Sequence, residues 1–192
     1  NSADIVYALQ KPFPVFGLKG NVDAYDVNGF TALMLAVIGN NRTLVNKLAK
    51  ERLANVNLRT NDLFNYPTLQ LALFQQNLDM ITLLLSLGAN PEQRDNAGRT
   101  ALLGIPWMQN LQKREQTLDM FIKAGANINT QDNLGNGLLY YLILHNDLPF
   151  FKYVLQKYGK TIQRDLKNNS SESPLELANR LRRPEFVQAL GG

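Results

Sequence analysis

A short turn motif recurs along the chain at a nearly constant interval. Segment 95–102 reads Asp-Asn-Ala-Gly-Arg-Thr-Ala-Leu, segments 26–33 and 132–139 align with it, and two further copies are degraded. The five copies begin at Asp26, Asp62, Asp95, Asp132 and Asn168. Their spacings are therefore 36, 33, 37 and 36 residues. A period of this length predicts a stack of small repeated units, each too small to bury its apolar face alone.

The second half of each unit repeats as well. The apolar stripe at 78–85 is followed by Gly88-Ala89-Asn90, and the stripe at 118–122 is followed by Gly125-Ala126-Asn127. Such a stripe predicts a helix that packs one face against the neighbouring unit. Glycine after a helix is typical of a left-handed C-terminal residue. We therefore expect Gly88, Gly125 and Gly159 to adopt that conformation.

These coincident turn, helix and loop signals resemble the ankyrin repeat, over roughly residues 20–190. The resemblance implies an all-α ankyrin-repeat solenoid, in which each unit has a β-turn finger and two antiparallel helices. A Thr or Ser is expected to cap the first helix of a unit. The expected organisation is one stacked domain with N-terminal capping helices in 1–25, units 26–61, 62–94, 95–131 and 132–167, and a C-terminal capping unit 168–192.

Several positions depart from the repeat pattern. Leu53 stands where the loop glycine belongs, and Asn65 replaces the turn glycine. Pro106 lies in the first helix of the third unit and should bend or shorten it. About four extra residues within 109–114 predict an inserted loop between the two helices of that unit. Gly137 replaces the capping Thr of the fourth unit.

Composition excludes several kinds of chemistry. The chain has no Cys and one His, His145, so disulfides, thiolate zinc sites, iron–sulfur clusters, cysteine nucleophiles and multi-histidine zinc sites are excluded. The repeated aspartates recur at the same structural point, which makes them turn-forming residues and not an acid–base pair. No phosphate-binding glycine loop or nucleophile elbow is present. We expect no enzyme activity, no cofactor and no metal.

Charge and termini give weaker signals. The net charge is +4, and residues 150–192 hold eight basic and four acidic residues. A solvated basic end explains this better than a nucleic-acid surface, so a nucleic-acid partner is not favoured. No apolar run is long enough for a transmembrane segment. The chain begins with Asn1 instead of Met and lacks Cys, which favours a secreted or periplasmic protein and leaves a cytoplasmic one open.

The resemblance implies that a partner binds the concave face, formed by the turn tips and the exposed side of the first helices. Mapped onto this chain, that face predicts a partner-binding set. Its members are Tyr25, Asn28, Phe30, Phe64, Tyr66, Phe74, Asn96, Arg99, Trp107, Met108, Asn133, Asn136 and His145. Val27, Ile38, Leu63, Leu134 and Leu144 belong to the wider mapping. Six of the 17 aromatic residues fall in the set, and aromatics and Arg are typical of binding hot spots.

An alternative is open for two of these residues. Phe64 could fold inward at its degraded turn, and Trp107 could fill the space left by Pro106.

We expect a non-catalytic module, monomeric alone, that binds another protein, for instance a bacterial inhibitor or immunity-type protein that occludes a partner enzyme. The alternatives are a scaffold or adaptor piece of a longer array, or a binder of nucleic acid or membrane through the basic C-terminal end.

Overall fold

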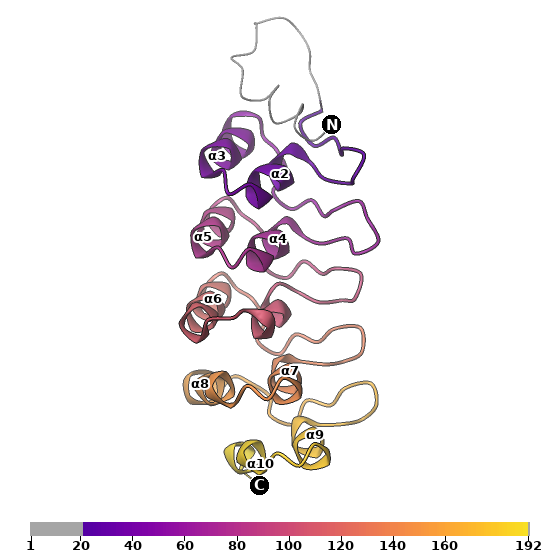
Figure 1. Ribbon diagram of the computed structural model, residues 1–192, viewed down its shortest axis with the longest axis vertical. Coiled ribbons are helices and arrows are strands. Elements are labelled where there is room, and N and C mark those ends of the chain that lie inside the picture. Colours follow the sequence, from indigo (N-terminus) through magenta and orange to yellow (C-terminus); the bar gives the residue numbers. More distant parts are fainter. Residues whose placement is uncertain (1–20, 192) are drawn as a thin grey trace, which may run out of the picture. The chain divides into compact units, whose positions relative to one another are not determined.

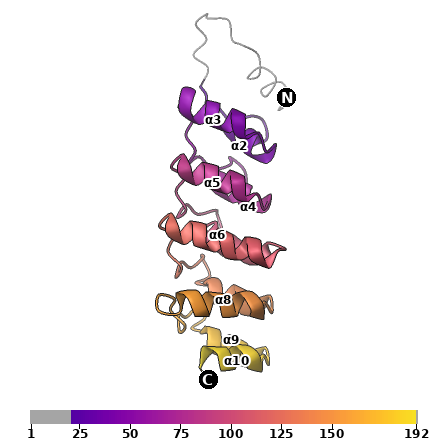
Figure 2. The ribbon, with the colours of Figure 1, turned by 90° about the vertical axis from the view of Figure 1, so that its left-hand side faces the viewer.

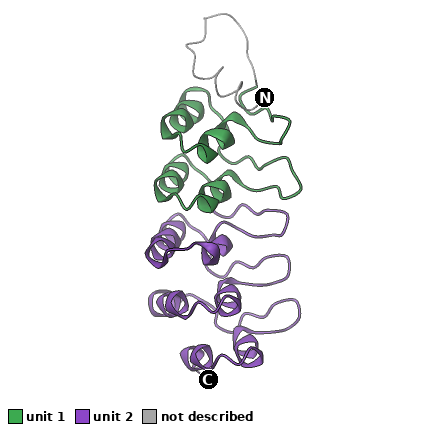
Figure 3. Cartoon of the chain, in the orientation of Figure 1, with its two compact units in different colours: residues 1–90 green, residues 91–192 purple. Residues whose placement is uncertain are grey.

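The computed structural model describes residues 21–191, which form helices, turns and one isolated β-bridge between Arg59 and Pro67. The helices that we expect in segment 1–25 lie almost wholly outside the described residues. The chain divides into two compact units, unit 1 (residues 1–90) and unit 2 (residues 91–192) (Figure 3). Among the described residues, no helix combines the length and apolar character that a bilayer span requires.

The described part of unit 1, residues 21–90, contains two helix pairs. They are α2 (Ala32–Ile38) with α3 (Arg42–Glu51), and α4 (Thr68–Phe74) with α5 (Leu78–Ser86). The helices of each pair contact one another, and α2 also contacts α4. Aliphatic and Met side chains fill the space between them, with Leu33, Met34, Leu48, Leu69 and Ile81 fully buried.

Unit 2 contains three pairs. They are the 3₁₀ helix η1 (Leu102–Trp107) with α6 (Leu111–Lys123), α7 (Leu138–Leu144) with α8 (Leu148–Tyr158), and α9 (Pro174–Arg180) with α10 (Pro184–Leu190). Within each unit the turns extend to one side of the helices, and the second helices of the pairs lie on the other side (Figure 1). Figure 2 turns these second helices toward the viewer.

The first helices begin as the sequence predicts in two pairs. The Thr31 hydroxyl accepts a hydrogen bond from the Met34 N–H, and the Ser173 hydroxyl accepts one from the Glu176 N–H. Gly137 provides no side-chain cap for α7, as expected. Thr100, however, does not cap a helix: η1 begins after Ala101, and the buried Thr100 hydroxyl has no hydrogen-bond partner among the described residues.

Pro106 has the predicted effect on the third pair. It lies inside η1, a six-residue 3₁₀ helix, where the other first helices are α-helical. The prediction of an inserted loop before the next helix is wrong. Residues 111–114 instead form the first turn of α6, which has 13 residues and is capped by the Asn110 side chain. The extra residues lengthen the helix because Asn110 supplies its N-terminal cap at their start.

The left-handed conformation expected of the glycines that follow helices is confirmed at two of the three positions. Gly88 and Gly125 have φ values of 86° and 92°, and Leu53 adopts the same left-handed region with φ of 58°. Asn65 likewise replaces a turn glycine at φ of 54°. The expectation for Gly159 is wrong: its φ of −59° continues the right-handed helix α8.

Candidate partner-binding face

The repeated aspartates hold the turns. Asp95 Oδ1 accepts hydrogen bonds from the N–H groups of Ala97 and Arg99, both at 2.9 Å. The same arrangement occurs at Asp26 and Asp132, and Asn168 supplies its amide oxygen in the fifth turn. The side chains mimic a backbone turn partner. Among the described residues, no group of three or more His, Cys, Asp or Glu could hold a metal ion.

The second turn of unit 1 holds Phe64 outward. The Asp62 carboxylate accepts hydrogen bonds from Thr60 Oγ1 and from the N–H groups of Phe64 and Asn65. Burial raises the pKa of Asp62, but these hydrogen bonds outweigh it and leave the pKa below its ordinary value. Thr60 Oγ1 in turn accepts from the Tyr66 N–H at 2.8 Å. The turn is therefore fixed on both sides of Phe64.

An aromatic cluster formed by Phe64, Tyr66 and Phe74 covers this part of unit 1. The Phe64 and Tyr66 rings stack at 5.3 Å, and Tyr66 meets Phe74 edge-on at 4.9 Å. Phe64 is 57% exposed and Phe74 is 49% exposed. The alternative in which Phe64 folds inward is therefore wrong. We call these three residues the unit 1 aromatic cluster.

A second cluster, formed by Trp107, Tyr141 and His145, lies in unit 2. Trp107 contacts Tyr141 at 5.0 Å and His145 at 4.9 Å between ring centroids, and it remains 47% exposed. Trp107 thus packs on its neighbours and still presents half of its surface. We call these residues the unit 2 aromatic cluster.

Tyr141 is the member of that cluster that the sequence reasoning missed. It is buried, and its hydroxyl donates a hydrogen bond to the Asp132 carboxylate. Burial raises the pKa of Tyr141 far above its ordinary value, and the Asp132 carboxylate raises it further. The signal was present, because Tyr141 precedes His145 by four residues and therefore shares its helix face.

Two residues of the predicted set do not reach the surface. Met108 is 4% exposed, because the backbone turns extended directly after η1 and points its side chain inward. Asn136 is 8% exposed, and its amide oxygen accepts a hydrogen bond from Asn168 Nδ2 at 3.1 Å. Their assignment to the face is wrong, because Met108 is buried in the core and Asn136 is buried against the next turn.

Three polar members of the set, Asn96, Arg99 and Asn133, also form hydrogen bonds within or between turns. Asn133 Nδ2 donates to the Asn96 carbonyl at 2.9 Å, and the Asn133 N–H donates to the Ala97 carbonyl at 3.0 Å. A Cβ at Gly98 would overlap the Asn133 side chain, so the two turns approach closely. Arg99 forms a double contact with the Asp95 carboxylate, at 3.0 Å for both Nε and Nη2.

The remaining predicted residues lie at the surface or near it. Asn28 and His145 are exposed, and Phe30 is half-buried. Tyr25 is exposed on one side and donates its hydroxyl to the Arg59 carbonyl at 2.9 Å. The apolar positions of the wider mapping are all exposed: Val27, Ile38, Leu63, Leu134 and Leu144.

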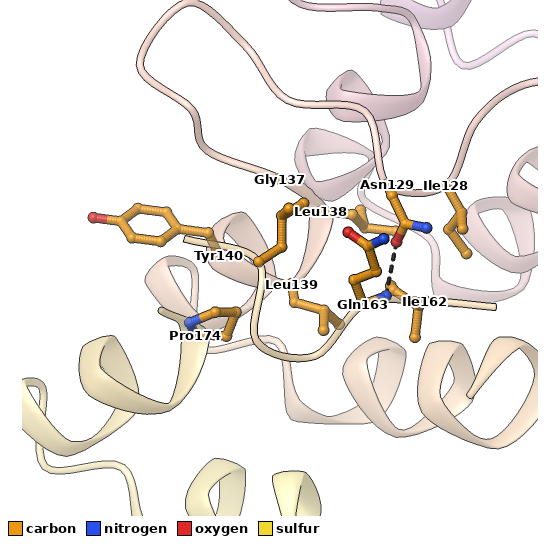
Figure 4. A pocket seen from close by; sticks show the side chains of 10 residues that line it. Ile128, Asn129, Gly137, Leu138, Leu139, Tyr140, Ile162, Gln163 and Pro174 are labelled. Atoms are coloured by element: carbon orange, nitrogen blue, oxygen red, sulfur yellow. Dashed lines mark hydrogen bonds between the residues drawn. The ribbon is translucent and has the colours of Figure 1, made fainter. Parts of the chain in front are cut away.

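A small pocket in unit 2 lies between a turn and the start of α7. Leu138, Tyr140 and Ile162 are among its lining residues, and Asn129 Oδ1 accepts a hydrogen bond from the Gln163 N–H across it (Figure 4). Its free volume of about 10 Å³ accommodates roughly one water molecule. This pocket therefore has no room for a ligand larger than a water molecule.

Comparison with known proteins supports the repeat assignment. The family model for ankyrin repeats, in three copies, matches residues 1–95. An ankyrin repeat protein of Acanthamoeba polyphaga mimivirus is 28% identical over 153 residues, which are 79% of this chain and 19% of the relative. The chain thus spans about a fifth of the length of that relative.

Among solved structures, the fold resembles one chain in the structure of the Bd0816 predatory endopeptidase from Bdellovibrio bacteriovorus in complex with immunity protein Bd3460. The TM-score is 0.73 at 21% identity, and the match covers 91% of this chain and 86% of that chain. At this identity the likeness concerns the fold alone. Together with the regular turns and helix pairs, these matches confirm the all-α ankyrin-repeat solenoid. The two sequence matches and the repeated helix pairs support an ankyrin repeat protein.

Proposed function

We propose that this chain is a non-catalytic module that binds a partner protein through the turn tips and the exposed side of its first helices. Ankyrin arrays, like other solenoids, offer extended surfaces for such binding. The contact residues that we propose are, in unit 1, the aromatic cluster with Tyr25, Asn28 and Phe30. In unit 2 they are the aromatic cluster with Asn96, Arg99 and Asn133.

The observation that carries the proposal is the exposure of the unit 1 aromatic cluster. Phe64 and Phe74 each leave about half of their surface in water, although burying a large apolar side chain is worth about 1.5–3 kcal/mol. The turn that holds Phe64 is fixed by hydrogen bonds through Asp62 and Thr60, so little ordering is needed when a partner binds. Exposed, preorganised aromatic rings are typical of interface hot spots.

Within this function we favour an inhibitor or immunity-type protein that occludes a partner enzyme. The support is the fold likeness to a chain from a complex of an endopeptidase with an immunity protein. Exposed aromatic rings on preorganised turns would cover an enzyme's substrate cleft without contributing catalytic groups.

The test has two stages. Wild-type chain is used to capture partners from lysate of the source organism, and the same capture is run with Phe64→Ala, with Trp107→Ala and with Lys152→Ala, an exposed control on α8. We expect one partner to be lost with both aromatic variants and retained with the control. The partner's enzymatic activity is then measured with increasing amounts of this chain. Loss of the partner's activity at stoichiometric addition supports an inhibitor. If both aromatic variants capture the partner as well as the wild type does, the proposed face is wrong.

A scaffold or adaptor piece of a longer array is the second candidate. It is favoured by the mimivirus relative, because the matched region is 19% of that protein. The same activity assay separates the two functions: an adaptor would bind the partner through the clusters and leave its activity unchanged.

A further inference from the structure

The turn between α9 and α10 differs from the corresponding turns elsewhere in the chain. The second helix of every other pair begins with an Asn or Asp whose side chain accepts a backbone hydrogen bond. These cap residues are Asn41, Asn77, Asn110 and Asp147. In the last pair the same position is Arg183, which has a similar backbone conformation and provides no side-chain cap. Arginine cannot accept a hydrogen bond, so the local stability of α10 is lower than it could be.

The residue before it is unusual too. Arg182 adopts a left-handed conformation with φ of 53°, where the equivalent residues are Asn40, Gln76 and Asn146. Two adjacent arginines thus replace two small or neutral polar side chains. Substitutions that break a local rule in this way are expected at functional sites.

A groove lies beside these two arginines. It is lined by Ala178, Pro184 and Val187 on its apolar side and by Arg182 and Arg183 on its polar side, and its volume is about 520 Å³. We call it the arginine groove. This size is in the range of small-ligand sites and accommodates a few peptide residues.

The charge in the groove is not neutralised by the described part of the chain. Arg180, two residues earlier, forms a double contact with the Glu172 carboxylate at 2.6 and 3.0 Å. For Arg182 and Arg183 the structure records no ion pair with a described residue, and the buried Arg183 Nη1 has no hydrogen-bond partner there. Two guanidinium groups that line a groove without a recorded carboxylate partner among the described residues would stabilise an incoming anion by charge-assisted hydrogen bonds.

We infer that the arginine groove binds an acidic peptide segment of a partner protein. A carboxylate of that segment pairs with the guanidinium groups of Arg182 and Arg183, and an apolar side chain next to it packs against Pro184 and Val187. The apolar side of the groove favours a peptide over nucleic acid, which is held by longer rows of phosphate contacts. The proposed contacts come from the side chains of the groove and not from the N-terminal N–H groups of α10, which is a short helix of seven residues.

A direct binding measurement tests this inference. The probe is the fluorescent peptide Glu-Asp-Leu-Glu-Asp, with Gln-Asn-Leu-Gln-Asn as the neutral control, titrated with the whole chain at about 50 mM salt. We expect Arg182→Gln with Arg183→Gln to weaken binding of the acidic peptide at least about ten-fold. The matched control is Lys160→Gln with Arg164→Gln, which removes the same charge from exposed positions and should change binding less than about two-fold.

Three results would overturn the inference. They are an equal loss in the control pair, equally tight binding of the neutral peptide, and arginine-dependent binding of a single-stranded oligonucleotide with no binding of the acidic peptide.

A second variant separates binding from folding. Arg183→Asn restores the cap found in the other pairs, so the melting temperature should rise by about 2–4 °C while acidic-peptide binding falls at least about ten-fold. Unchanged binding in this variant contradicts the inference whatever its stability. The inference is also independent of the proposed aromatic face: Phe64→Ala and Trp107→Ala should leave peptide binding unchanged, so that either proposal can fail alone.

Discussion

The two units differ in how many of their aromatic side chains they bury. In the described part of unit 1, all five aromatic side chains are exposed or half-buried: Tyr25, Phe30, Phe64, Tyr66 and Phe74. Unit 2 fully buries four phenylalanines, namely Phe121, Phe150, Phe151 and Phe186. The core of unit 1 is filled by Leu, Met and Ile instead. The described aromatic rings of unit 1 therefore contribute little to its core, which favours the proposal that they serve recognition.

The two units also differ in the residue that follows the first Asp or Asn of each turn. In unit 2, Asn133 Nδ2 donates to the Asn96 carbonyl and Asn169 Nδ2 donates to the Asn133 carbonyl, so amide side chains link successive turns. The corresponding residues of unit 1 are the exposed apolar Val27 and Leu63. One turn position thus braces neighbouring turns in unit 2 and presents apolar surface in unit 1.

The largest expected effect is on stability. Phe151→Ala in unit 2 should lower the free energy of unfolding by about 3–5 kcal/mol, because Phe151 is fully buried and packs edge-on against Phe186 at 4.9 Å. Phe64→Ala in unit 1 should cost about 1 kcal/mol or less, because it loses mainly its stacking with Tyr66. Urea unfolding followed by circular dichroism measures both. Similar losses in the two variants would remove the distinction between the units.

The next effect is on partner binding. Phe64→Ala, Tyr66→Ala and Trp107→Ala should each weaken affinity for the captured partner by at least about 2 kcal/mol, roughly 30-fold. Calorimetric titration measures the dissociation constants, with Lys152→Ala as the surface control. If only the Trp107 variant loses affinity, the recognition surface is confined to unit 2, and the interpretation of the exposed rings of unit 1 is wrong.

The turn tips allow a matched pair of substitutions. Asn133→Ala removes the hydrogen bond to the Asn96 carbonyl and should lower the free energy of unfolding by about 1 kcal/mol. Leu63→Ala changes an exposed tip and should leave stability within about 0.5 kcal/mol while weakening partner binding. The opposite order of stabilities would mean that the tips of both units serve the same purpose.

A smaller gain is expected in unit 1. Leu53 adopts a left-handed conformation that favours glycine, so Leu53→Gly should raise the free energy of unfolding by about 0.5–1 kcal/mol. Leu53→Ala keeps the strain and is the control. Thermal unfolding measures the shift, and equal stability of the two variants would show that the conformation costs nothing.

The smallest effect concerns pH. Burial raises the pKa of Asp119, but hydrogen bonds from Lys157, Tyr158 and Tyr153 outweigh it, and the pKa lies below its ordinary 3.8. Since the folded pKa is depressed, this stabilisation is present above pH 3.8 and is lost as pH falls through the folded pKa. Asp119→Asn should flatten the acid limb of stability by less than about 1 kcal/mol, because Asp119 is partly solvated.

The control for the pH measurement lies in unit 1. Asp79 pairs with Arg42 at 3.4 Å, and both side chains are largely exposed, so Asp79→Asn removes an ion pair that solvent screens and serves as the matched control. Urea unfolding at several pH values between about 2 and 6 makes the comparison. Identical slopes for the two variants would contradict a special role of the Asp119 network.

The repeat register was predictable because it rests on local chemistry. Asp and Asn side chains form the turns with neighbouring N–H groups, Thr31 and Ser173 cap helices, and Pro106 shortens the helix in which it lies. Each of these effects acts within a few residues, so spacing alone was enough. The same local reasoning failed where a choice depended on neighbours: the extra residues near Asn110 joined α6, and Gly159 continued α8.

Which residues form the surface was decided by packing between turns and helices that are far apart in sequence. Asn136 became buried against Asn168 of the next turn, and Tyr141 joined Trp107 from another helix pair. The sequence by itself determined the repeat, the turns and the helix pairs, because these follow from hydrogen bonds and apolar periodicity along the chain. Only the tertiary structure decided which aromatic rings remain exposed and that Arg182 and Arg183 line one groove, because exposure depends on what the rest of the chain covers.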